Sequence, residues 1–85
     1  ESVGWRFSAA NPFDYSKVFH FLKQLQVDRA KAVFITDKGI YGYNLAGCTL
    51  SEIEIDDCVE SRIEIIAEHI EADWETALLS CLLSD

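Results

Sequence analysis

Residues 29–46 decide the fold, and their sequence is RAKAVFITDKGIYGYNLA. The run from 30 to 36 contains an uninterrupted Val-Phe-Ile triplet, which is typical of a strand covered on both faces. Asp37-Lys38-Gly39 follows as a turn, because glycine readily adopts the positive φ that tight turns require. In residues 40–46 aromatic side chains alternate with small and polar ones, as in a strand. The segment therefore predicts a β-hairpin.

A strand and a helix are expected before the hairpin. Residues 5–8 alternate apolar and polar side chains, which is a strand signal of period two. Pro12 ends this strand, because proline fixes its own φ and pushes the preceding residue to extended geometry. A helix is expected from about residue 14 to 25, since apolar side chains recur there at helical spacing. Its N-cap is expected to be Asp14 or Ser16.

Two more strands and a second helix are expected after the hairpin. Residues 50–56 and 61–67 alternate apolar and mostly charged side chains, and the isoleucines of both are expected to face the core, namely Ile53, Ile55, Ile63 and Ile65. A last helix is expected over 74–83, with Asp73 as its N-cap. Its apolar stripe consists of Trp74, Ala77, Leu78, Cys81 and Leu82.

The expected element order is therefore β-α-β-β-β-β-α. Strands joined by short turns form a mostly antiparallel sheet, here of about five strands. The helical crossover makes the first two strands parallel, with or without another strand between them. Because each helix has one apolar stripe, the prediction is an α+β two-layer sandwich with both helices on one face of the sheet. The 85 residues suffice for a single domain, 1–85.

The charge is uneven along the chain, which has a net charge of −8. Residues 1–49 have a balance of +2, and residues 50–85 have a balance of −10. A strongly acidic half repels phosphate backbones, so nucleic acid is not an expected partner. The apolar runs are too short to span a bilayer, so a membrane is not expected either. The three cysteines, Cys48, Cys58 and Cys81, have unrelated spacings. They predict free thiols and a cytoplasmic location.

Motifs for catalysis or cofactor binding are not recognisable in the chain. A phosphate-binding loop requires Gly-x-x-x-x-Gly-Lys-Ser/Thr, and none of the 4 glycines begins this pattern. Nucleophilic catalysis requires a Ser or Cys beside a base. The two histidines, His20 and His69, lie in no such motif. We therefore expect no catalytic residue, no cofactor-binding residue and no enzymatic activity in this chain.

One segment contains candidate metal ligands. His69 is flanked by Glu68 and Glu71, and a histidine with carboxylates can bind a divalent metal weakly. Solvent-exposed charge is the competing interpretation, because this segment connects two elements.

An acidic row is expected on the fourth strand. Glu52, Glu54 and Asp56 are spaced two residues apart and would share one face, away from the core. We interpret this row as solvated or facing a partner, since paired carboxylates do acid–base work only where a cleft raises one pKa.

Several motifs occur in a fixed order along the chain, namely Gly4-Trp5-Arg6-Phe7, Phe13-Asp14, Arg29 to Thr36, Asn44, Glu60 to Ile66, and Trp74. Their order resembles that of the C-terminal domain of CobW-type P-loop GTPases, proteins of metal handling and cobalamin synthesis. The resemblance covers nearly all 85 residues. The chain departs from the family at Ala32, which replaces a glycine, and at Asp57-Cys58-Val59, where a basic pair is usual.

The resemblance implies a non-catalytic accessory domain of a GTP-dependent metal chaperone or insertase. Its partner would be the N-terminal GTPase domain of the same chain or a metal-receiving client protein. GTP and a divalent metal such as zinc or cobalt are implied for the parent protein, not for this segment. A chain that begins at Glu1 rather than Met is expected to be excised from a longer one. The alternatives are a stand-alone acidic interaction module and a weak metal-binding domain.

Overall fold

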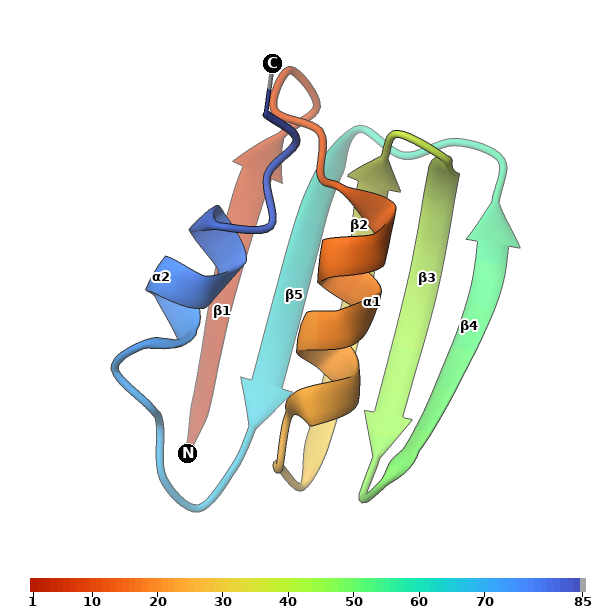
Figure 1. Cartoon of the computed structure of the whole chain (residues 1–85). Coiled ribbons are helices and arrows are strands. Elements are labelled where there is room, and N and C mark those ends of the chain that lie inside the picture. The colour runs from red at the N-terminus through yellow and green to blue at the C-terminus, as the bar shows by residue number, and fades with distance from the viewer. Residues whose placement is uncertain (85) are drawn as a thin grey trace.

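The computed structural model describes residues 1–84 and has a five-stranded sheet with two short helices (Figure 1). The strand order is β1-β5-β2-β3-β4, and every pair of neighbours is antiparallel. The strands are β1 (Ser2–Ser8), β2 (Arg29–Thr36), β3 (Gly39–Ala46), β4 (Thr49–Ile55) and β5 (Glu60–Ile66). The predicted α+β class and element order are confirmed.

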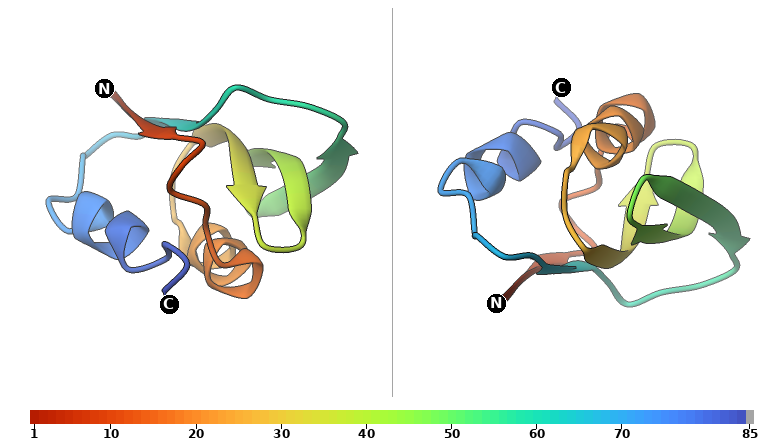
Figure 2. Two further views of the ribbon diagram at one scale, coloured as in Figure 1. Left: turned by 90° about the horizontal axis from the view of Figure 1, so that it is seen from above. Right: turned by 90° about the horizontal axis from the view of Figure 1, so that it is seen from below.

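Both helices cover the same face of the sheet, as predicted (Figure 2). Helix α1 (Tyr15–Gln24) connects β1 to β2, and helix α2 (Trp74–Leu79) follows β5. Strands β1 and β2 run parallel because β5 lies between them and is antiparallel to both. Within residues 1–84, no helix lies against the opposite face of the sheet, which we call the open face (Figure 2). The domain is therefore a two-layer sandwich.

The start of α1 is fixed by two carboxylates. Asp14 is the N-cap, as predicted, and its Oδ1 accepts a hydrogen bond of 3.0 Å from the Lys17 N–H. The Asp37 carboxylate, in the β2–β3 turn, accepts the Tyr15 N–H at 2.8 Å. Gly39 follows this turn with a φ of 138°, a conformation that glycine adopts most easily. The Asp37 side chain thus hydrogen-bonds the β2–β3 turn to the first turn of α1.

The core lies between the helices and the sheet. Phe34 of β2 and Phe13 are fully buried, with ring centroids 4.9 Å apart in an edge-to-face arrangement. Phe7 of β1 adds a second edge-to-face contact to Phe13, at 5.1 Å. The predicted stripe of α1 is buried at Val18, Leu22 and Leu25. The predicted inward residues of β5, Ile63 and Ile65, are buried as well.

The predicted extent of the last helix is wrong. Helix α2 ends at Leu79, and Leu82 pairs with Phe13 in an isolated antiparallel bridge. Cys81 accepts the Asp14 N–H at its carbonyl and still buries its side chain. The apolar spacing continued beyond the helix because this extended segment also faces the core. Asp73 is the N-cap residue of α2, as predicted, but its side chain makes no capping hydrogen bond within residues 1–84.

Strand β2 is covered on one face only, which contradicts the prediction of two covered faces. Its helix-side residues, including Ala32 and Phe34, are buried. Val33 and Ile35, on the open face, are half-buried. Within residues 1–84, no helix is both long and apolar enough to cross a bilayer.

Candidate functional site

The acidic row of β4 faces the side opposite to the one predicted. Glu52 is the register partner of Tyr43 and Glu54 that of Tyr41, and directly paired residues project from the same face of a sheet. Tyr43 is buried on the helix side. Both glutamates therefore lie on the helix side, at the edge that neither helix covers (Figure 1). Asp56 follows the last residue of β4 and does not continue the row.

The Glu52 carboxylate joins three elements. Its Oε2 accepts the hydroxyl of Tyr15 from α1 and the hydroxyl of Tyr43 from β3, each at 2.7 Å. Burial, and then the hydrogen bond to Glu52, raise the pKa of Tyr43. The hydrogen bond to Glu52 is the main cause that raises the pKa of Tyr15. Through these two hydrogen bonds, Glu52 links the N-terminal turn of α1 to the edge strand β4.

Aromatic rings border this carboxylate. The Tyr15 ring lies 5.0 Å from that of Tyr41 and 6.2 Å from that of Phe19, between centroids. Within residues 1–84, Glu54 has neither a hydrogen-bond nor an ion-pair partner. Of the predicted partner-facing residues, Glu54 thus retains a carboxylate available to a partner, whereas Glu52 is used inside the fold.

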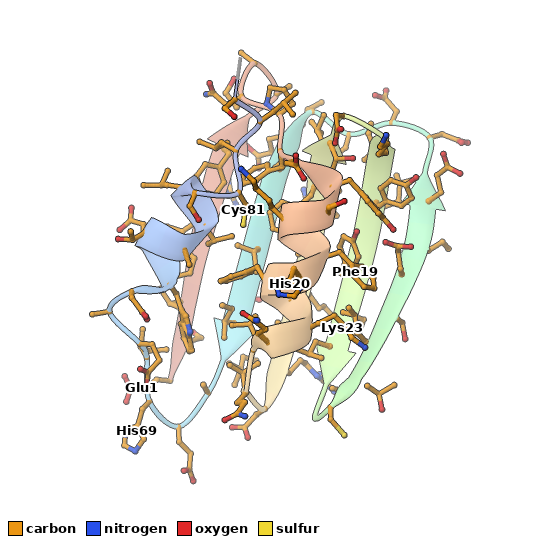
Figure 3. The ribbon with its side chains drawn as sticks, in the orientation of Figure 1. Glu1, Phe19, His20, Lys23, His69 and Cys81 are labelled. Atoms are coloured by element: carbon orange, nitrogen blue, oxygen red, sulfur yellow. The ribbon has the colours of Figure 1, made fainter. Side chains whose placement is uncertain are left out.

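The candidate metal ligands point into solvent. Glu68, His69 and Glu71 are exposed in the connection between β5 and α2. Figure 3 shows His69 directed away from the rest of the molecule. Within residues 1–84, no three His, Cys, Asp or Glu side chains are placed to share a metal ion. The structure does not bring these three side chains together as a ligand set.

The remaining histidine and the cysteines lie apart from one another. His20 is exposed on α1, where its Nε2 lies 3.1 Å from the Gln24 amide nitrogen (Figure 3). The three thiols are free. Cys48 is exposed, Cys58 donates to the Glu60 carbonyl at 2.9 Å, and Cys81 is buried. Burial raises the pKa of the Cys81 thiol, which keeps it protonated at neutral pH.

Sequence reasoning missed the open face of the sheet. A shallow concavity of about 1090 Å³ lies over it and includes Arg6, Arg62, Lys31, Val33 and Ile53 in its lining. Ile53 and Ile55 were expected in the core, but both project from the open face, and Ile53 is 68% exposed. This prediction is wrong because Gly42, not a core residue, is the partner of Ile53 in the register.

Part of this surface has a signal in the sequence. Arg6 lies between Trp5 and Phe7, and Arg62 lies between Ser61 and Ile63, all four of which point to the helix side. Both arginines were thus predictable on the face opposite to the core. Their alignment across two strands distant in the sequence had no local signal.

The chain was also compared with known proteins. No protein-family model, curated protein or solved structure was found to match it.

Proposed function

We propose that this chain is a non-catalytic interaction domain that docks on another protein domain. The observation that carries the proposal is the open face of the sheet, which no helix within residues 1–84 covers. There Ile53 is exposed, and Val33, Ile35, Ile40 and Ile55 are half-buried. Exposed apolar side chains gathered on one face are characteristic of surfaces that bind other proteins. A sheet normally buries its apolar faces against another element, which a partner would supply here.

The resemblance to CobW-type GTPases supports a particular partner. Its three strand motifs form β1, β5 and β2, which are adjacent in the sheet. Segments from distant parts of the sequence are thus united in one continuous surface. In this proposal the domain belongs to a GTP-dependent metal chaperone or insertase. It docks on the GTPase domain of the same chain or on the protein that receives the metal, and the parent binds GTP and a divalent metal such as zinc or cobalt.

The test is a titration of the ¹⁵N-labelled domain with the GTPase domain encoded by the same reading frame, loaded with GTP or GDP. We expect saturable amide shifts, and a smaller response with an unrelated P-loop GTPase as the control. A reading frame without Gly-x-x-x-x-Gly-Lys-Ser/Thr would overturn the GTPase part of the proposal. An unchanged spectrum with the cognate GTPase domain would overturn docking on that domain.

Glu54→Lys tests the acidic row as the contact. The charge reversal should leave the fold intact, because Glu54 has no partner within residues 1–84. Lower affinity of this variant for the GTPase domain would identify the acidic row as a contact. Glu52→Lys is unsuitable for this purpose, because it also removes the acceptor of the Tyr15 and Tyr43 hydroxyls.

A further inference from the structure

Two arginines face each other across β1 and β5 on the open face. Arg6 and Arg62 are direct register partners, and like charges placed directly opposite destabilise a sheet. Arg6 pairs with Glu60 at 3.6 Å while its own side chain is 78% exposed. Within residues 1–84 this is the one ion pair, so Arg62 has no carboxylate partner of its own. Arg62 is therefore unpaired among the described residues, although Glu60 and Glu64 of the same strand project from the same face and Glu64 is the register partner of Lys31.

The arginines continue into an apolar surface along the register. Arg62 pairs with Val33, Val33 with Gly42, and Gly42 with Ile53. The next row toward the Ile55 end of β4 is apolar on three strands, with Ile35, Ile40 and Ile55. The open face thus has an apolar half on β2, β3 and β4 and a basic half that also includes Arg29 and Lys31. Four of the 7 Lys and Arg residues lie on it.

Gly42 makes room for two isoleucines of β4. A Cβ at this position would lie 2.7 Å from Cδ1 of Ile55 and 3.4 Å from Cγ2 of Ile53. The two isoleucine side chains therefore lie over a residue that has no side chain, and they fill the space above it. Strands of 7 residues are about 24 Å long. A helix of about 16 residues has the same length.

Resting on the proposed function, we infer that the open face binds an amphipathic helix of the partner protein, whose apolar stripe is bordered by carboxylates. The apolar stripe lies against Val33, Ile35 and Ile53, and the carboxylates reach Arg62 and Lys31. A helix on this face converts the two-layer sandwich into three layers and neutralises the paired arginines.

Charge distinguishes this occupant from two others. Nucleic acid is disfavoured because a phosphate backbone offers no apolar surface to Val33 and Ile53, and because the whole chain has a net charge of −8. A second copy is disfavoured because a two-fold contact sets two copies of the same basic face against each other. An amphipathic helix has an apolar stripe for the apolar half and far fewer negative charges than a phosphate backbone.

The probe is a stapled peptide of about 16 residues with leucines at helical spacing and glutamates along both borders. The control peptide has lysine at every glutamate position. We expect the glutamate peptide to shift amides of all five strands, with the largest shifts in β5, β2, β3 and β4, and to bind more weakly as salt rises. The lysine peptide should bind at least about tenfold more weakly.

Three protein variants locate the contact. Arg62→Glu should weaken binding of the glutamate peptide about tenfold, because it replaces attraction by repulsion. Ile53→Ser should weaken it about tenfold through lost apolar contact. Lys17→Glu makes the same charge change on α1 as Arg62→Glu makes on the open face, and should leave the affinity unchanged.

Four outcomes overturn the inference. Two concern the peptides: equal affinity for both, and amide shifts centred on α1 and α2. Two point to another occupant: displacement of the peptide by single-stranded DNA, and a dimer in sedimentation that Arg62→Glu abolishes.

The GTPase titration distinguishes failure of this inference from failure of the proposed function. If the GTPase domain binds and Glu54→Lys, not Arg62→Glu, weakens it, the inference fails and the proposed function stands. If no GTPase domain binds while the glutamate peptide does, the GTPase docking fails instead.

Discussion

The helix-covered face and the open face belong to the same five strands, yet they differ in what their side chains contact. On the covered face, the Phe7, Phe13 and Phe34 rings pack edge to face beneath the helices. On the open face, Val33 and Ile53 share a register row with the like-charged pair Arg6 and Arg62. The first arrangement stabilises the domain by itself, whereas we propose that the second is completed by a partner. The comparison teaches that strand alternation in this chain separates residues that build the core from residues that remain accessible on the open face.

The two faces should differ most in how much the free energy of unfolding falls when an apolar side chain is removed. Phe34→Ala should lower the free energy of unfolding by about 3–5 kcal/mol, because Phe34 is fully buried and a cavity remains. Ile53→Ala should change it by no more than about 0.5 kcal/mol. Urea unfolding followed by circular dichroism measures both. A similar loss for the two variants would show that the open face is covered in solution, which would break the comparison.

Two serine-to-alanine variants compare how much a hydroxyl stabilises the domain on each face of the sheet. The Ser61 side chain is fully buried on the covered face, and its Oγ accepts the Ile35 N–H at 2.9 Å. Ser61→Ala leaves that donor without its acceptor and should cost about 1–3 kcal/mol. Ser51→Ala, on the open face, is the matched control and should cost less than about 0.5 kcal/mol. Equal urea midpoints for the two variants would contradict the assigned role of the Ser61 hydroxyl.

Local signals in the sequence were sufficient for most of the elements. The Asp37-Lys38-Gly39 turn and the alternation in β5 depend on neighbouring residues, and both predictions are confirmed. The alternation in β4 was predicted, but its isoleucines were assigned to the core side and its glutamates to the outer side, which is the reverse of what the structure shows. Apolar periodicity shows which residues share a face, whereas pairing with β3 determines which face the helices cover. At an edge strand beyond α1 neither face is fully buried, so hydrophobicity does not decide the orientation.

The site depended on contacts that the sequence does not encode locally. Tyr15 and Glu52 meet over a separation of 37 residues, and Arg6 and Arg62 meet through the β1–β5 register. Each of these residues alone is typical of an ordinary surface. Only the strand order brings them together, and the chain pattern left that order open.

An alkaline titration tests the hydrogen bonds at the edge of the covered face. Burial and the Glu52 carboxylate raise the pKa of Tyr43 above its ordinary value of 10.0. As the pH rises through 10.0, the unfolded chain therefore releases the Tyr43 proton before the folded chain does, and stability falls. Tyr43→Phe should be less stable at neutral pH by about 1 kcal/mol, with a shallower alkaline decline.

The matched control for this titration is Tyr41→Phe. It removes a hydroxyl that contacts the Lys38 carbonyl at 3.5 Å rather than Glu52. Urea unfolding of the wild type, Tyr43→Phe and Tyr41→Phe at neutral pH and above pH 10.0 shows which hydroxyl is responsible for the alkaline loss of stability. An alkaline decline that is identical in wild type and Tyr43→Phe would contradict the proposed effect of burial and Glu52.

The smallest expected effect has the opposite sign and belongs to the open face. Arg62→Gln removes one of two cations that are direct register partners, so it should raise the free energy of unfolding by about 0.2–0.5 kcal/mol. Arg6→Gln is the matched control and should have no net effect, because it relieves the same repulsion but loses the ion pair to Glu60. Both variants should also weaken binding of the glutamate peptide. A residue that reduces stability while it increases affinity contributes to binding at the expense of folding. A loss of stability in Arg62→Gln would instead show that the aliphatic part of Arg62 packs on Val33 and helps to hold the sheet.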